Sequence, residues 1–177
     1  MQQEETVQNK IQQLQEQFYA QNPKRSFFKE SQKIQCSEHI AQQLNLEMLL
    51  QKSFYIKANT NNIVCDYTIF KTFANANNYE IMINYVMNLV NQCIKQYSTF
   101  ELHVNLKSFT ITAAQRHMDV IRHFCEKCLN KDSLYCNQLQ TLYLYNCPSM
   151  IQTVQRLFSG FMDKDSLLKV VLRNENI

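Results

Sequence analysis

The chain has 177 residues, of which 45% are hydrophobic, and a formal net charge of +3. This hydrophobic content is enough for a folded core and excludes a disordered tail. The balance of 18 Lys and Arg against 15 Asp and Glu is too small for the one-sided basic surface of a nucleic-acid-binding domain. The single glycine, Gly160, excludes the glycine-rich phosphate loops of Rossmann and Walker nucleotide sites.

The first 51 residues are predicted to form a helical N-terminal extension. A helix over 1–22 carries a narrow apolar stripe at helical spacing and ends before Pro23, since the residue before a proline avoids the α region. A basic linker over 22–36 follows, and Ser37 is predicted to cap a second helix that reaches Leu50 or Gln51. The stripe is formed by Val7, Ile11, Leu14 and Phe18.

Residues 53–177 are predicted to form one α/β domain. The predicted elements are strands over 53–57 and 63–70, a helix over 79–97, a strand over 100–109, a helix over 112–129, a strand over 139–145, a helix over 149–162 and a strand over 167–172. This β-β-α-β-α-β-α-β order favours a single mixed sheet with parallel central strands and helices packed on it. Because glycine is scarce, we expect Asn, Ser, Asp and Lys to occupy the turn positions, with Asn as the best substitute in a left-handed conformation.

Two segments resemble the CRAL-TRIO lipid-binding family. One is the strand over 101–106 with the helix that follows it. The other, LYLYNCPSMIQTVQRLFSGFMDKDSLLKVVL over 142–172, resembles the family's strand, Asn-x-Pro, helix, Asp-Lys, strand segment. The matching positions are Asn146, Pro148, Asp163 and Lys164. The resemblance implies a CRAL-TRIO-like domain over 53–177 that is truncated, because the family's C-terminal gate helix has no counterpart after Leu172. A STAS-like regulatory binding domain is the runner-up.

The reactive side chains do not form a catalytic or metal constellation in the sequence. The best metal candidate is Cys125 and Cys128 with Cys136 and Cys147, but Cys125 and Cys128 share an apolar helix stripe and are predicted to be core thiols rather than zinc ligands. Cys147 is predicted to be a packed or partly exposed thiol at the end of a strand rather than a nucleophile. His123 is expected to form a solvated pair with Asp119. We therefore expect no enzymatic activity, no cofactor and no metal.

Location follows from the cysteines and the polar composition. Seven cysteines without framework spacing favour a reducing, intracellular compartment. About a fifth of the chain is Asn or Gln, which resembles some protist proteomes and favours the cytoplasm or a cilium, with the mitochondrion as the alternative. The sequence contains no run of ~18 apolar residues, so no transmembrane helix is predicted. The acidic N-terminus lacks the basic start and apolar run of a signal peptide.

The function expected from these features is that of a structural subunit that binds other proteins in a larger assembly. The predicted docking residues are the stripe residues Val7, Ile11, Leu14 and Phe18 together with Phe27 and Phe28. A basic patch surrounds the two phenylalanines and could instead contact anionic lipid. It consists of Lys24, Arg25, Lys29 and Lys33. The alternative function, implied by the resemblance, is lipid binding or transfer.

Overall fold

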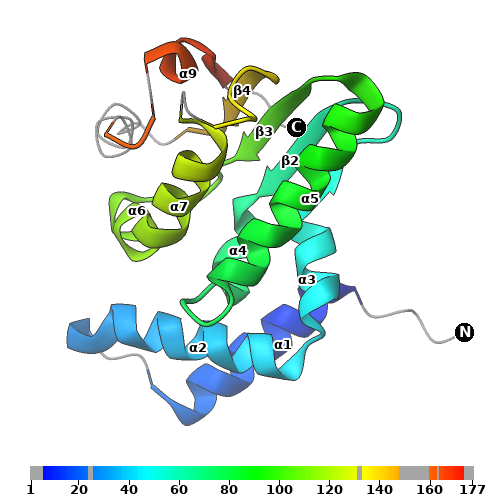
Figure 1. Ribbon diagram of the computed structural model, residues 1–177. Coiled ribbons are helices and arrows are strands. Elements are labelled where there is room, and N and C mark those ends of the chain that lie inside the picture. The colour runs from blue at the N-terminus through cyan, green and yellow to red at the C-terminus, as the bar shows by residue number, and fades with distance from the viewer. Residues whose placement is uncertain (1–5, 24–25, 131–132, 148–159, 163, 174–177) are drawn as a thin grey trace, which may run out of the picture.

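A five-stranded mixed sheet forms the centre of the molecule (Figure 1). The computed structural model describes residues 6–23, 26–130, 133–147, 160–162 and 164–173. The strands, in their order across the sheet, are β1 (Phe54–Ile56), β2 (Asn62–Asp66), β3 (Phe100–Asn105), β4 (Leu139–Tyr145) and β5 (Val170–Arg173). β1 runs antiparallel to β2, and β2 to β5 are parallel. The predicted α/β class, with helices before one mixed sheet, is confirmed.

The predicted hairpin is present, but its second strand is shorter than expected. β1 pairs with β2 so that Phe54 lies opposite Cys65. The second strand ends at Asp66 instead of Phe70, because the Asp66 carboxylate accepts a hydrogen bond from the Thr68 N–H at 2.8 Å and caps a helix, α4 (Tyr67–Phe73). A local capping signal therefore overrides the β-rich composition of this segment.

The N-terminal helices differ from the prediction in where they begin and end. They are α1 (Val7–Gln21), the 3₁₀ turn η1 (Ser26–Phe28), α2 (Lys29–Gln43) and α3 (Leu46–Ser53). The predicted cap at Ser37 is wrong, because the Ser37 hydroxyl donates to the Ile34 carbonyl at 2.7 Å inside a helix that is already formed. Asn45 caps α3 by accepting from the Met48 N–H at 3.0 Å, which divides the predicted long helix in two.

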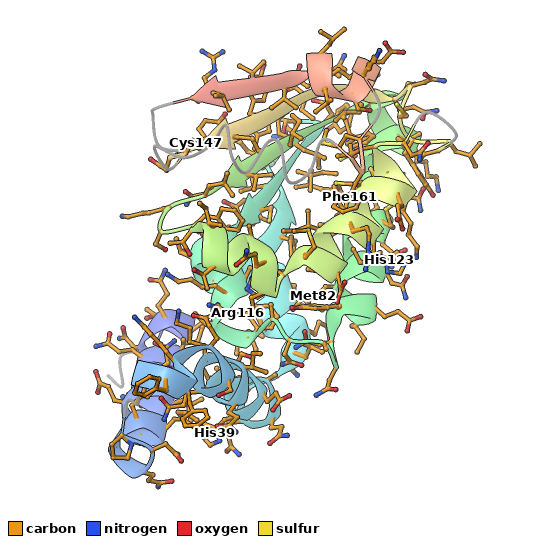
Figure 2. The ribbon with its side chains drawn as sticks, turned by 90° about the vertical axis from the view of Figure 1, so that its left-hand side faces the viewer. His39, Met82, Arg116, His123, Cys147 and Phe161 are labelled. Atoms are coloured by element: carbon orange, nitrogen blue, oxygen red, sulfur yellow. The ribbon has the colours of Figure 1, made fainter. Side chains whose placement is uncertain are left out.

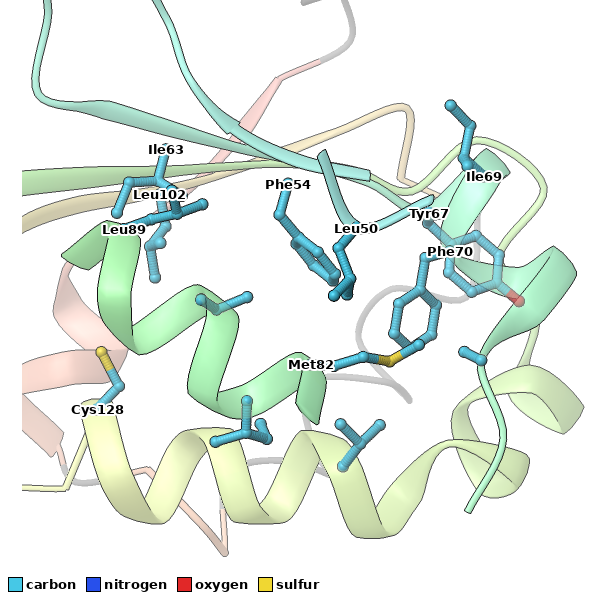
Figure 3. Close-up of a cluster of buried hydrophobic side chains, with 14 of the residues drawn as sticks. Leu50, Phe54, Ile63, Tyr67, Ile69, Phe70, Met82, Leu89, Leu102 and Cys128 are labelled. Atoms are coloured by element: carbon cyan, nitrogen blue, oxygen red, sulfur yellow. The ribbon is translucent and has the colours of Figure 1, made fainter. Parts of the chain in front are cut away.

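Helix α5 (Tyr79–Tyr97) has the bounds predicted for it. The next predicted helix is divided at His117 into α6 (Ile111–Arg116) and α7 (Met118–Cys128). It begins one residue earlier than expected because the Thr110 hydroxyl, not Thr112, accepts from the Ala113 N–H at 3.2 Å. In Figure 3 both α5 and α7 lie beneath the strands, so they cover the same face of the sheet.

The C-terminal part is described only in places. The predicted helix over 149–162 lies largely outside the described residues. The predicted strand over 167–172 starts later than expected, because residues Lys164–Leu168 form a short helix, α9, before β5. The Ser166 hydroxyl of this helix is buried and donates to the Leu129 carbonyl at 2.7 Å, which attaches α9 to the end of α7.

Asparagine and serine make the turns that glycine makes in most proteins. Four residues of the described chain have a positive φ, namely Asn59, Ser98, Ser108 and Asn146, with values of 59°, 66°, 67° and 52°. Short polar side chains tolerate this left-handed conformation better than larger ones. The expectation that Asn and Ser replace glycine in turns is confirmed at these positions.

The hydrophobic core lies between the sheet and the helices. Its large buried side chains include Leu50, Phe54, Phe70, Met82 and Leu102, which come from α3, β1, α4, α5 and β3 (Figure 3). One continuous cluster therefore joins the N-terminal helices to the sheet.

Among the helices that the structure describes, none has both the length and the apolar character needed to span a bilayer.

Candidate functional site

An apolar cavity of about 250 Å³ lies between the sheet and helices α4, α5 and α7. Its described lining is aliphatic, aromatic and sulfur-containing, apart from Tyr67 and His117. The residues from the strands are Phe54, Ile63, Cys65, Leu102, Val104, Leu142, Leu144 and Val170. The helices contribute Tyr67, Phe70, Met82, Ile83, Val86, Val120, Ile121, Phe124 and Cys125, and the loops contribute Leu106, Phe109, His117, Leu129 and Met162. This cavity is the candidate functional site.

The floor of the cavity follows from the alternation of side chains along the strands. Leu102 and Val104 of β3 lie on the same face, and the parallel register places them beside Leu142 and Leu144 of β4. The branched side chains on this side of the sheet together form an apolar surface, which is the floor of the cavity.

The wall of the cavity is built by the apolar stripes of α5 and α7. Met82 and Val86 are one turn apart on α5 and both are buried, as the helical period predicted. On α7, Val120 and Cys125 are buried on the side that faces the cavity. Burial raises the pKa of the Cys125 thiol to about 12, so this side chain is a neutral, apolar part of the wall.

Besides Tyr67, His117 is the residue of the described lining that carries polar side-chain atoms. It stands where α6 ends and α7 begins, and it is 1% exposed. Its Nδ1 lies 3.0 Å from the Tyr79 hydroxyl, whereas its Nε2 has no hydrogen-bond partner among the described residues. Burial lowers the pKa of the imidazole to about 4, an effect that the neighbouring Arg116 charge increases and Glu30 opposes. The ring is therefore neutral at physiological pH.

Next to His117, Arg116 of α6 lies beside the N-terminal helices (Figure 2) and forms an ion pair with α2. The Arg116 guanidinium donates from Nε to Glu30 of α2 at 2.8 Å and makes a second bond to the same oxygen from its terminal nitrogen. Burial acts to raise the pKa of the Glu30 carboxyl, but hydrogen bonds from Lys33 and Arg116 outweigh it, so the pKa is lowered. The positive charge of the Arg116 guanidinium is thus already paired with the negative charge of Glu30.

The predicted docking residues of the first helix lie against the core of their own chain. Ile11 is 5% exposed, and the other stripe residues are partly buried against the same hydrophobic cluster. Phe27 and Phe28 differ, because they are 95% and 60% exposed in η1. That a partner binds these residues remains a prediction.

The four residues of the predicted basic patch are not seen together as one patch in the described part of the chain. Lys24 and Arg25 lie outside the described residues. Lys29 is exposed, and Lys33 is paired with Glu30 at 2.7 Å within α2. Residues 29–36 of the predicted linker are helical.

The residues that carried the family resemblance lie at the end of β4 and around α9. Asn146 has a positive φ and donates to the Asn105 side chain at 2.9 Å, which ties the ends of β4 and β3 together. Lys164 begins α9, while Pro148 and Asp163 lie outside the described residues.

The reactive residues considered in the sequence are dispersed. Cys125, Cys128 and Cys136 are buried, and no three His, Cys, Asp or Glu side chains in the described part of the chain are placed to hold a metal ion. The Asp119 carboxylate accepts from Arg122 at 2.6 Å, and its pairing with His123 stays a prediction.

Sequence reasoning missed the two features that define the site. The cavity has no signature of its own, because the same apolar stripes would serve a fully packed core. His117 had one usable signal, a histidine in line with the apolar stripe beside Ala114 and Met118.

Comparison with known proteins supports the fold. No protein-family model matches the chain, and no curated protein matches it in sequence. Among solved structures, the crystal structure of Sfh5, a CRAL-TRIO protein of the Sec14 family, matches with a TM-score of 0.58 at 15% identity. The match covers 92% of this chain and 64% of Sfh5, so the chain spans somewhat less than two thirds of that neighbour. The chain therefore has a CRAL-TRIO-like fold.

Proposed function

We propose that this chain is a non-enzymatic module that binds one single-chain lipid in the cavity between the sheet and helices α5 and α7. The observation that carries the proposal is the cavity of about 250 Å³ with its almost wholly apolar lining. Well-packed interiors contain few voids larger than a water molecule, so a space of this size inside a small domain is costly unless a ligand fills it.

The volume limits the size of the ligand. An apolar cavity of about 150 Å³ binds benzene, so this one holds a molecule of roughly ten to fifteen non-hydrogen atoms. That matches one acyl chain of medium length and is too small for a two-chain phospholipid. The lining favours the same ligand, because its apolar side chains recover the hydrophobic free energy of a chain at about 25 cal/mol per Å² buried.

A cavity-filling variant tests the proposal. Val86 is 7% exposed and lines the cavity, so Val86→Phe places a ring in the space that the lipid would occupy. The matched control is Ile81→Phe, because Ile81 lies on the same helix and is 49% exposed. Native mass spectrometry and organic extraction are expected to find a single-chain lipid with the unmodified protein and the control, and to find it strongly reduced with Val86→Phe.

Two results would overturn lipid binding. One is that neither purification nor added single-chain lipid gives a complex with the unmodified protein. The other is that both variants retain lipid equally while circular dichroism shows both to be folded, because binding would then lie outside the cavity.

A second candidate function is that of a subunit in a larger protein assembly. It is favoured by one observation, the 95% exposure of Phe27 beside the 60% exposed Phe28. Exposed aromatic side chains next to each other are enriched in protein interfaces. Affinity purification from the native source is expected to recover specific partners that Phe27→Ser with Phe28→Ser loses, while lipid binding is unchanged. Partners retained by the double variant would exclude this surface.

A further inference from the structure

The cavity contains a polar atom that its surroundings do not satisfy. Of the two ring nitrogens of His117, Nδ1 is 3.0 Å from the Tyr79 hydroxyl, and Nε2 is buried without a hydrogen-bond partner among the described residues. Three aromatic rings surround it: the ring centroid of Phe70 lies 5.0 Å from that of His117, and those of Tyr67 and Tyr79 lie 6.2 Å away. A buried donor or acceptor left unpaired costs about 1–3 kcal/mol, so a ligand atom that pairs with it gains binding free energy.

The hydrogen bonds around Tyr79 determine which kind of atom Nε2 is. The Tyr79 hydroxyl has one proton, and its two acceptors are His117 Nδ1 at 3.0 Å and the Arg116 carbonyl at 3.4 Å. If the hydroxyl donates along the shorter of these two contacts, the acceptor is Nδ1. A neutral imidazole that accepts at Nδ1 carries its proton on Nε2. In this tautomer Nε2–H is a hydrogen-bond donor within the apolar lining.

The charges near the site restrict the acceptor to a neutral one. The described lining contains no Lys, Arg, Asp or Glu, and the guanidinium of Arg116 is engaged with Glu30. An ionised carboxylate would be buried without a counter-ion, which costs far more than one hydrogen bond returns. A carbonyl or hydroxyl oxygen carries no such penalty.

We propose that Nε2–H of His117 donates a hydrogen bond to a neutral oxygen of the bound molecule, so that the cavity selects single-chain alcohols, ketones or esters over hydrocarbons and ionised fatty acids. This inference rests on the proposed lipid binding and adds the chemical class of the ligand. His117 is then the specificity-determining residue of the cavity.

Calorimetric titration with a matched ligand series tests this selection. The ligands are 2-nonanone and 1-octanol, the hydrocarbon 1-octene, and octanoate at pH 8. The unmodified protein is expected to bind the ketone and the alcohol about tenfold or more tightly than 1-octene, the ratio that a hydrogen bond of ordinary strength produces. Octanoate is expected to bind more weakly than the alcohol.

The variant His117→Phe keeps a ring of similar shape and removes the donor. It is expected to reduce affinity for 2-nonanone about tenfold and to leave affinity for 1-octene unchanged. A general loss of structure would lower both affinities together, so the ratio separates selection from stability. Val86→Phe serves as the control that blocks all four ligands.

A measurement on the unmodified protein covers the case in which His117→Phe does not fold. Long-range ¹H–¹⁵N spectra of ¹⁵N-histidine-labelled protein are expected to show His117 protonated on Nε2, with this resonance moving when 2-nonanone is added. Equal affinity for ketone and hydrocarbon, or a proton on Nδ1 in the complex, would overturn the role of His117 and leave lipid binding intact. Failure to bind any of the four ligands would overturn lipid binding itself.

Discussion

The two faces of the central strands are packed in different ways, although both come from alternate residues of the same segments. On the cavity face, Leu102 of β3 and Leu144 of β4 point toward the helices. On the opposite face, the His103 ring lies 4.8 Å from the Tyr143 ring and 5.8 Å from the Tyr145 ring, in stacked arrangements. Its Nδ1 also lies 2.8 Å from the Tyr145 hydroxyl.

The difference shows where the space for a ligand comes from. Neighbouring strands are about 4.8 Å apart, so flat rings on adjacent strands stack directly and fill their face without help from another layer. Branched aliphatic side chains on adjacent strands also contact one another, but they complete their burial against the helices above them. Where α5 and α7 do not come close enough to the sheet, a void remains. We therefore expect stability to be distributed differently on the two faces.

The largest expected effect is on the cavity face. Leu102 is 4% exposed and central in the sheet, so Leu102→Ala is expected to lower the free energy of unfolding by about 3 kcal/mol, the usual cost of truncating a buried leucine. Urea denaturation measures this loss. Leu172→Ala in β5 is the control, since Leu172 is 45% exposed and its truncation should cost less than about 1 kcal/mol. Equal losses would mean that the cavity face is not part of the core.

The second prediction concerns the pH dependence of stability. The pKa of His117 is about 4 in the folded protein and about 6.5 in the unfolded chain. The unfolded state therefore binds more protons as the pH falls, and the stability present above pH 6.5 is lost progressively toward pH 4. This single group is expected to remove about 2.5 kcal/mol between pH 7.5 and pH 4.5, measured by urea denaturation at both values.

The same measurement on variants compares the two faces. His117→Phe is expected to remove this part of the pH dependence. His103→Phe should remove less, because burial lowers the pKa of His103 but the hydrogen bond and charge of Glu101 act to raise it. If both variants keep the full pH dependence of the unmodified protein, other groups control it.

The elements that the sequence predicted well are those in which a periodic pattern coincides with burial. Helix α5 and strand β4 have their predicted bounds because their apolar periods of 3.6 and 2 run without interruption. The errors lie where a single side chain decides the backbone. Asp66 ends a strand and Asn45 divides a helix through side-chain capping hydrogen bonds, whereas Asn78, which precedes α5, makes no such bond to that helix.

The sequence predicted the fold that contains the site, through a family resemblance, but not the site itself. The strand and helix order around Asn146 suggested the CRAL-TRIO-like architecture, which the structural neighbour supports. The cavity depends on the distance between two layers, and sequence periodicity contains no information on that distance. The role of His117 depends on Tyr79, 38 residues away, whose hydroxyl fixes one ring nitrogen.

The smallest predicted effect belongs to the stacked face. Tyr145→Phe keeps the ring that stacks on His103 and removes the hydroxyl that lies 2.8 Å from its Nδ1. A hydrogen bond between neutral groups contributes about 1 kcal/mol to folding, so the free energy of unfolding should fall by about this amount. Tyr143→Phe is the matched control, because the Tyr143 ring stacks on the same imidazole but its hydroxyl has no hydrogen bond in the described part of the chain.

The pair of tyrosine variants separates stacking from hydrogen bonding on this face. A loss of about 1 kcal/mol for Tyr145→Phe, with almost none for Tyr143→Phe, would assign the difference to the His103 hydrogen bond. Losses of similar size would show instead that the rings alone hold the face together. Ligand affinity should be unchanged in both variants, because both side chains lie on the side of the sheet away from the cavity, so binding measured in parallel tests whether the two faces act independently.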